Sequence, residues 1–200
     1  LIFNYGASGT LVTQVLAGAP CDVVITADYS VLERLQAAER LGSMNIHPLV
    51  TNRLVIALRE GNPLEVTAPS GLLSPEIKRI AIGKPGIVPA GTYAKLWLEK
   101  LDLWEKLSSK LIYTPHVRAA NTSLQMGNVD AAIVYKTDLR HQPKLRITYE
   151  FPQNETLKIV YPLAVLDREI DRGEVQHFLE FLKSDQALQI FIDHGFDPVD

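Results

Sequence analysis

The sequence predicts an α/β fold with two lobes, and three observations support this prediction. Short apolar runs rich in β-branched residues alternate with stretches of helical periodicity along all 200 residues. Two long apolar runs, RLVIAL (53–58) and KIVYPLAVL (158–166), lie far apart and enclose a self-contained α/β set. The two C-terminal helical stretches then need a sheet that only the N-terminal strands can supply, so the chain leaves the first lobe and returns to it.

The elements follow from the apolar pattern, taken in chain order. The predicted strands are 1–5, 21–26, 53–58, 79–83, 110–114, 131–135, 145–151 and 158–166. The predicted helices are 9–17, 28–40, 91–101, 117–127, 173–183 and 185–193. Because strands and helices alternate, the sheets are expected to be mostly parallel.

The two long apolar runs set the expected domain boundaries. Residues 1–52 with 167–200 form lobe I, and residues 59–159 form lobe II. Residues 53–58 and 160–166 are two crossing strands that act as the hinge. Clefts between α/β lobes are favoured sites for small molecules, so a ligand is expected in the cleft between the lobes.

Composition excludes several function classes. With 20 basic and 23 acidic residues the net charge is −3, which makes nucleic acid an unexpected partner. No apolar run reaches the length of a membrane span, and no signal segment is present. The chain opens inside an apparent strand without Met, which suggests a processed or truncated start. Cys21 is the single cysteine, which excludes an internal disulfide, and no histidine spacing indicates a metal-cation site.

The stretch NYGASGTL (4–11) places Ser8 between a predicted strand and a predicted helix. A nucleophile elbow requires G-x-S-x-G, but Thr10 stands where the second glycine belongs, so a catalytic serine is disfavoured. Ser8 is alternatively the N-cap of a helix that begins at Gly9 or Thr10. The small residues around Ser8 leave helix N–H groups open, which favours a third interpretation, anion binding.

A second helix start has the same character. The predicted strand 79–83 runs into a Pro/Gly loop, and Pro89 leads into Ala90 and Gly91. An ordinary strand-to-helix turn explains this stretch by itself. Two small-residue helix starts in two different lobes, both after strands, favour one anion shared between them.

Tyr161 is the third candidate. It precedes Pro162 inside a predicted crossing strand, and a proline is not expected in the middle of a sheet. An irregular crossing strand would direct the phenol of Tyr161 toward the cleft. The alternative is an ordinary core tyrosine.

Several motifs together resemble the periplasmic molybdate-binding proteins of ABC transporters. The matching stretches are GASGTLVTQVLAGAPCDVVITAD, IAIGKPGIVPAGTYAKLWLEKLDLWEKL, VRAANTSLQMGNVDAAIVYKTD, FPQNETLKIVYPLAVL and IFIDHGF. They keep the order and spacing of the family over nearly the whole chain. The resemblance implies a two-lobed periplasmic-binding-protein-like fold with two crossing strands as hinge and a cleft between the lobes.

The resemblance also implies a ligand set without counter-charges. The hydroxyl and N–H of Ser8, the backbone N–H groups of Ala90 and Val134, and the phenol of Tyr161 would hold a molybdate or tungstate oxyanion. Such a donor-only site would exclude sulfate by size and protonated phosphate for lack of an acceptor. No cofactor and no metal cation are implied.

The implied function is delivery of the anion to the membrane permease of an ABC transporter, not catalysis. The protein is then expected to be a monomer in the periplasm or another extracytoplasmic space, either soluble or lipid-anchored. The alternative is an oxyanion-sensing module of a transcription regulator, since fold alone does not fix function. Relative to the family, the chain lacks the N-terminal strand–helix unit, which would supply a second serine.

Overall fold

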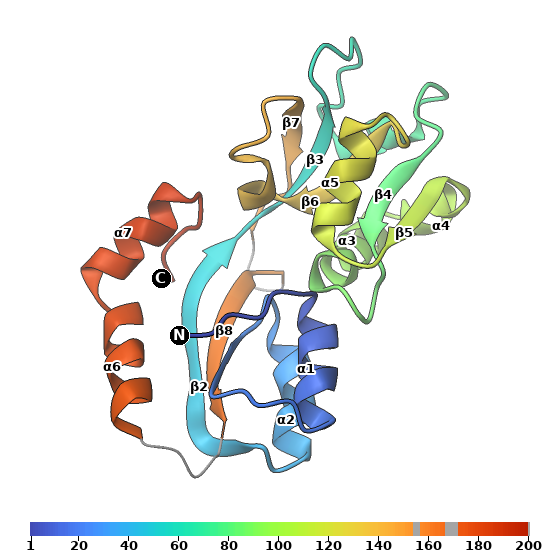
Figure 1. Cartoon of the computed structure of the whole chain (residues 1–200). Helices are drawn as coiled ribbons and strands as arrows, with labels where there is room; N and C mark the ends of the chain where they lie inside the picture. The colour runs from blue at the N-terminus through green and yellow to red at the C-terminus, as the bar shows by residue number, and fades with distance from the viewer. Residues whose placement is uncertain (154–156, 167–171, 200) are drawn as a thin grey trace. The chain divides into compact units, whose positions relative to one another are not determined.

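A computed structural model describes residues 1–153, 157–166 and 172–199 of the chain (Figure 1). The chain divides into two compact units, each with its own sheet, so the predicted two-lobed α/β class is confirmed. Unit 1 comprises Leu1–Asn52 and Ile159–Asp200, and unit 2 comprises Arg53–Lys158. The predicted lobes also include residues 154–156, 167–171 and 200, which lie outside the described residues.

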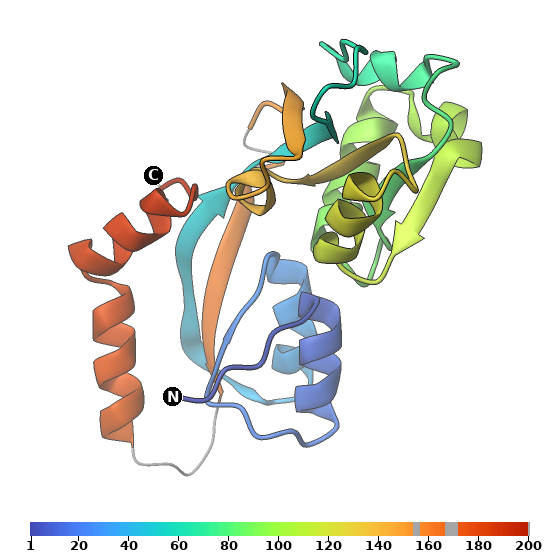
Figure 2. The same cartoon turned by 45° about the horizontal axis from the view of Figure 1, so that its top comes forward.

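Unit 1 is built on a three-stranded sheet with its last strand in the centre. The order is β1 (Val23–Ile25), β8 (Ile159–Leu166) and β2 (Leu41–Asn52). Helices α1 (Ser8–Leu16) and α2 (Tyr29–Ala37) lie on one side of this sheet. Helices α6 (Arg172–Leu182) and α7 (Asp185–Asp193) lie on the other (Figures 1 and 2). Apolar side chains of α1, α2 and all three strands form one buried cluster: Val12, Val15, Val24, Leu32, Leu35, Leu41, Ala164 and Leu166.

Unit 2 contains a five-stranded sheet in the order β5-β4-β6-β3-β7. The strands are β3 (Leu54–Arg59), β4 (Ile80–Gly83), β5 (Leu111–Thr114), β6 (Ala131–Tyr135) and β7 (Leu145–Glu150). The α-helices are α3 (Pro89–Lys100), α4 (Trp104–Leu107) and α5 (Val117–Gln125). Short 3₁₀ helices are η1 (Pro69–Leu73), η2 (Ser108–Lys110) and η3 (Lys136–Leu139). Helices α3 and α5 cover opposite faces of the sheet (Figure 1).

The expectation of mostly parallel sheets is wrong. Only β4 pairs in parallel, with β5 and with β6, and the other described pairings are antiparallel. Parallel neighbours need a crossover of helical length, and in unit 2 only the β4–β5 and β5–β6 connections carry α-helices between strands. Strand β7 follows β6 after the short helix η3 and pairs antiparallel with β3, and in unit 1 the strands β1 and β2, separated by α2, both pair antiparallel with β8, so alternation alone does not set strand direction.

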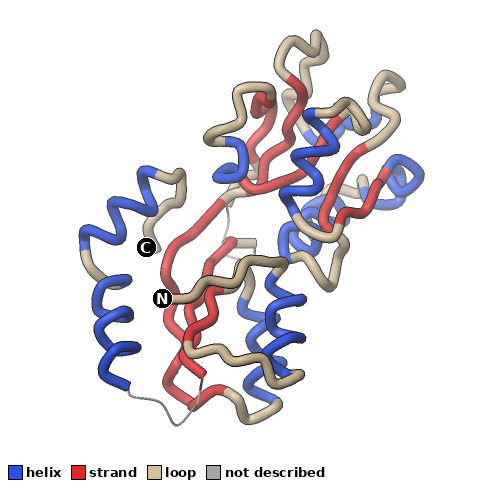
Figure 3. Tube along the Cα trace, in the orientation of Figure 1, coloured by secondary structure: helices blue, strands red, loops and turns tan. Residues whose placement is uncertain are grey.

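The predicted strand at residues 1–5 is absent, and this segment is a loop (Figure 3). Apolar character predicted the strand, but a strand exists only within a ladder, and no described strand pairs with these residues. Their side chains are exposed, with Phe3 at 60% and Tyr5 at 74%. The two rings stack on each other, with centroids 6.1 Å apart.

Strand β2 was missed, and the role expected of Pro162 is corrected. Pro162 lies in the central strand of the unit 1 sheet, where a proline was not expected. It pairs with Pro48 of β2, and the register shifts between Pro48 and Val50. The Pro162 carbonyl still accepts a hydrogen bond from Thr26 N at 3.0 Å. A local irregularity in β2 therefore accommodates a proline that a regular ladder would not.

Within the ranges described above, no helix has the length and apolar character that crossing a membrane would require.

Candidate functional site

The carboxyl ends of three strands of unit 2 meet at one edge of its sheet. Strand β4 runs parallel to β5 on one side and to β6 on the other, so the chain reverses its direction of winding at β4. The β4–β6 pairing reaches Ala81 and Ala132. Beyond it, β4 continues to Gly83 and β6 to Tyr135. In open α/β sheets such a switch point, at the carboxyl ends of the strands, is where ligands bind.

Helix α3 begins at this edge with Pro89 in its first turn. The Val88 carbonyl accepts from the N–H groups of Gly91 and Thr92, at 2.9 and 3.1 Å. Proline has no N–H, and within the described ranges no acceptor for the Ala90 N–H is present. Ala90 is fully buried. The structure therefore places this sequence-predicted residue at a helix N-terminus with a donor available to a ligand.

A second helix start lies at the same edge, and the sequence interpretation did not single it out. Helix α5 follows β5, and His116 is its N-cap. The His116 carbonyl and Nδ1 both accept from Ala119 N, at 3.1 Å each. The N–H groups of Val117 and Arg118 precede this first intrahelical bond and have no acceptor among the residues described. No small residue marks this start, which is why sequence reasoning missed it.

Val134 lies in the buried strand that the sequence predicted, one residue before its end. It lies inside β6, is fully buried, and pairs with Val55 of β3. Lys136 N donates to the Arg53 carbonyl, just before β3, at 2.8 Å. Because the amides of a strand alternate in direction, the Val134 amide, two residues earlier, points to the same side, toward β3. The Val134 N–H therefore faces the interior of the sheet, which argues against its donation to a ligand.

Ser8 begins α1 and is not its N-cap, which corrects one sequence-based interpretation. The N-cap is Ala7, whose carbonyl accepts from Thr10 and Leu11 N at 2.9 and 3.0 Å. The side chain of Ser8 makes no capping bond and is nearly buried, at 8% exposed. In the part of the chain that the structure describes, no acceptor is present for the Ser8 N–H.

The hydroxyl of Ser8 ties α1 to the end of β1. Its Oγ accepts from Ala27 N at 3.1 Å in a buried bond. The neighbouring Thr26 N donates to Pro162, the residue after Tyr161, so unit 1 brings Ser8 and Tyr161 onto adjacent segments. A serine hydroxyl that accepts one bond can still donate its own proton.

Tyr161 is half-buried in β8 and pairs with Val50. Its hydroxyl accepts from Asn52 Nδ2 at 3.2 Å. Its ring meets Phe196 edge to face, with centroids 5.2 Å apart. Asn52 is the last residue of unit 1 before the chain enters unit 2. The phenol is therefore held at the end of unit 1 where the chain crosses over.

One partly buried carboxyl also lies at the edge of unit 2. Burial raises the pKa of Asp138 from its ordinary 3.8 to about 6, against the opposing effects of the Tyr135 N–H and Arg118. Over the described residues, no group of three or more His, Cys, Asp or Glu side chains could hold a metal ion. The chemistry offered is that of neutral N–H and O–H donors at helix starts, which suits an anion.

Comparison with known proteins gives consistent results. The family "Bacterial extracellular solute-binding protein" matches residues 1–197. The chain is 36% identical over 193 residues to YvgL of Bacillus subtilis, which is named as a putative ABC transporter substrate-binding lipoprotein. The aligned region covers 96% of this chain and 74% of YvgL. The chain is 31% identical over 202 residues to the molybdate-binding protein ModA of Escherichia coli, covering 98% and 77%.

A solved structure has the same fold. The substrate-binding domain of a protein named for molybdenum ABC transport, from Clostridium difficile, is 32% identical with a TM-score of 0.75. The match covers 100% of this chain and 86% of that chain.

Proposed function

The chain belongs to the family of bacterial extracellular solute-binding proteins, and from this premise we propose that it binds molybdate or tungstate and delivers the anion to the permease of an ABC transporter. The observation that carries the proposal is the identity of 31% to a molybdate-binding protein over 98% of the chain. The relatives reported above are named for molybdate binding or ABC transport, and they lend no support to the alternative of a transcription regulator.

The proposed ligands are neutral donors from both units. Unit 1 contributes the N–H and hydroxyl of Ser8 and the phenol of Tyr161, and unit 2 contributes the Ala90 N–H. For the remaining backbone donor, the orientation of the Val134 amide leads us to propose the start of α5, at Val117, instead. Each charge-assisted bond is about twice as strong as a neutral one, so such a shell can hold a desolvated dianion without a fixed cation.

The remaining features of the proposal follow from this role. The protein acts by binding alone, without a cofactor, a metal cation or a catalytic step. Ser8 serves as a ligand and not as a nucleophile, because no general base contacts its Oγ among the described residues, where the Oγ accepts from the Ala27 amide. We place the protein in an extracytoplasmic space, as a monomer, either soluble or anchored by a lipid.

Calorimetric titration of the purified protein with molybdate, tungstate, sulfate and phosphate tests this function. Molybdate and tungstate are expected to bind with similar affinity, because they are nearly the same size. Sulfate is expected to bind at least about tenfold more weakly, because its S–O bonds are shorter than Mo–O bonds and each hydrogen bond from a rigid donor shell is therefore stretched. Equal affinity for sulfate and molybdate would remove the size argument, and no binding of any oxyanion would overturn the proposal.

Replacing Tyr161 with phenylalanine is expected to weaken molybdate binding about threefold to thirtyfold, because one hydrogen bond to a charged group is lost. The melting temperature of the unliganded protein should fall only modestly, since the Phe196 contact remains while the buried Asn52 Nδ2 loses the hydroxyl that accepts from it. Affinity by calorimetry and melting by circular dichroism give the two readouts.

Tyr29→Phe, on α2 of the same unit, is the matched control and should leave affinity unchanged. Tyr135→Phe removes a phenol from the edge of unit 2. If affinity fell with Tyr135→Phe but not with Tyr161→Phe, the phenol that donates to the anion would be that of Tyr135 in unit 2. A large fall in melting temperature for Tyr161→Phe would instead identify Tyr161 as a core residue.

A further inference from the structure

Asp138 follows β6 at the carboxyl-end edge of the unit 2 sheet, the edge at which α3 and α5 also begin. It belongs to η3, the turn that follows β6. Its Oδ2 accepts from Tyr135 N at 3.3 Å, and its backbone carbonyl accepts from Asn121 Nδ2 at 3.2 Å. Asp138 is thereby tied both to the carboxyl end of β6 and to α5.

The Asn121 side chain provides a second, independent sign of incomplete polar pairing beside Asp138. Asn121 is 5% exposed, and its Oδ1 has no hydrogen-bond partner among the residues that the structure describes. A buried acceptor without a donor costs free energy, so such groups cluster where protonation or a ligand completes the pairing. The side chain that binds the Asp138 backbone carbonyl thus carries an unpaired buried acceptor.

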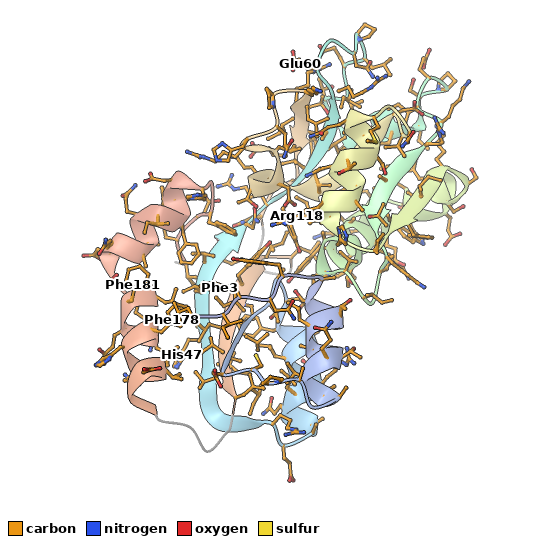
Figure 4. All side chains as sticks on the ribbon, viewed as in Figure 1. Phe3, His47, Glu60, Arg118, Phe178 and Phe181 are labelled. Carbon is orange, nitrogen blue, oxygen red and sulfur yellow. The ribbon has the colours of Figure 1, made fainter. Side chains whose placement is uncertain are left out.

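Charged groups reach this region from each element packed against η3. Helix α5 contributes Arg118 on its first turn (Figure 4), and this guanidinium is the cation that acts on Asp138. Strand β7 contributes Glu150, which is paired with Lys136 Nζ at 3.0 Å and with Arg53 Nη1 at 3.8 Å. Glu150 is thus paired with two cations, whereas the Asp138 carboxyl accepts from the Tyr135 N–H and is acted on by Arg118.

We propose that Asp138 takes up a proton when the oxyanion binds, so that the affinity of the protein for molybdate rises as the pH falls. This inference rests on the proposed function. A dianion at the edge of unit 2 disfavours the charged form of a nearby carboxyl, and linkage requires that protonation of the carboxyl favours the anion equally. Burial already holds the pKa of Asp138 at about 6, so the uptake falls within an accessible pH range.

The test measures molybdate affinity by calorimetry from about pH 6 to about pH 8 for wild type and Asp138→Asn. Asparagine keeps an acceptor for the Tyr135 N–H but cannot titrate. Wild type is expected to bind about threefold to tenfold more tightly at the lower pH. Asp138→Asn should bind with nearly constant affinity, close to that of wild type at low pH. Titrations in buffers of different ionisation enthalpy should show proton uptake for wild type alone.

Two further variants exclude other sources of pH dependence. Asp130→Asn removes a carboxylate that holds Lys78 and Arg79 N at the opposite end of β4, and it should retain the wild-type pH profile. His116→Asn retains a cap for α5 and removes the imidazole at the same edge. A profile that persists in Asp138→Asn but disappears in His116→Asn would overturn the inference.

A readout without ligand keeps the inference testable if binding is weak. Because the folded-state pKa of Asp138 is raised, the folded protein binds more protons between about pH 4 and about pH 6, and stability falls as pH rises through that range. Asp138→Asn should therefore gain stability relative to wild type as pH rises. Failure of all oxyanions to bind at any pH would refute the proposed function, whereas pH-independent binding by wild type would refute only the role of Asp138.

Discussion

Replacing Gly91 with alanine is expected to lower the free energy of unfolding by about 3 kcal/mol or more and to weaken molybdate binding at least about tenfold. A Cβ at Gly91 would lie 1.9 Å from the Gly83 carbonyl oxygen. Gly83 ends β4 and pairs with Thr114 of β5, and β6 holds the strand two residues earlier at Ala81, so the strand has little room to give way. The start of α3 must shift instead, and the Ala90 amide moves with it. Urea unfolding and calorimetry measure the two effects.

Gly71→Ala is the matched control for this prediction. An alanine Cβ there would lie 3.2 Å from Val66 Cγ1, a side-chain atom that can adjust. The control should change stability by no more than about 1 kcal/mol and leave affinity intact. If Gly91→Ala behaved like Gly71→Ala, close contact between α3 and β4 would not be what positions the Ala90 amide.

Replacing Ser8 with alanine is expected to reduce molybdate affinity about tenfold to a hundredfold, because the hydroxyl that would donate to the anion is removed. Stability should fall by about 1–2 kcal/mol, because the buried Ala27 N–H loses the oxygen to which it donates. The two losses are separable, since affinity is measured by calorimetry on folded protein and stability by urea unfolding.

Ser184→Ala separates a ligand role from a structural one. The Ser184 Oγ accepts from Ala187 N at 3.2 Å, a bond of the same kind in the same unit, at the start of α7. This variant should lose about 1 kcal/mol of stability and keep full affinity. Equal affinities for Ser8→Ala and wild type would show that Ser8 only joins α1 to the segment after β1.

Buried strands were predicted well because a strand that is covered on both faces consists of a continuous run of apolar residues. Residues 131–135 were predicted as a strand, and β6 occupies the same residues, all of them buried. Strand β2 escaped prediction because LGSMNIHPLVTN has no alternation, and its pairing with β8 holds it extended. Residues 1–5 show the converse, because apolar character alone does not make a strand without a neighbour.

The residues of the candidate site also differ in whether a short sequence motif reveals them. Ser8 and Ala90 could be found from sequence because small residues mark helix starts that leave N–H groups open. Val117 could not, because a histidine caps α5 and no small residue precedes it. The direction of the Val134 amide depends on strand register, and register is set by long-range pairing that a short motif does not encode.

The central place of β8 in unit 1 has a consequence for the order of events during synthesis. Strands β1 and β2 pair with β8 and not with each other, yet β8 is translated after the whole of unit 2. Unit 2 can therefore fold on the ribosome while both earlier strands still wait for their partner. Ribosome-bound chains that end before β8 should leave β1 and β2 open to chaperones and proteases, and protection should arise abruptly once residue 166 has emerged.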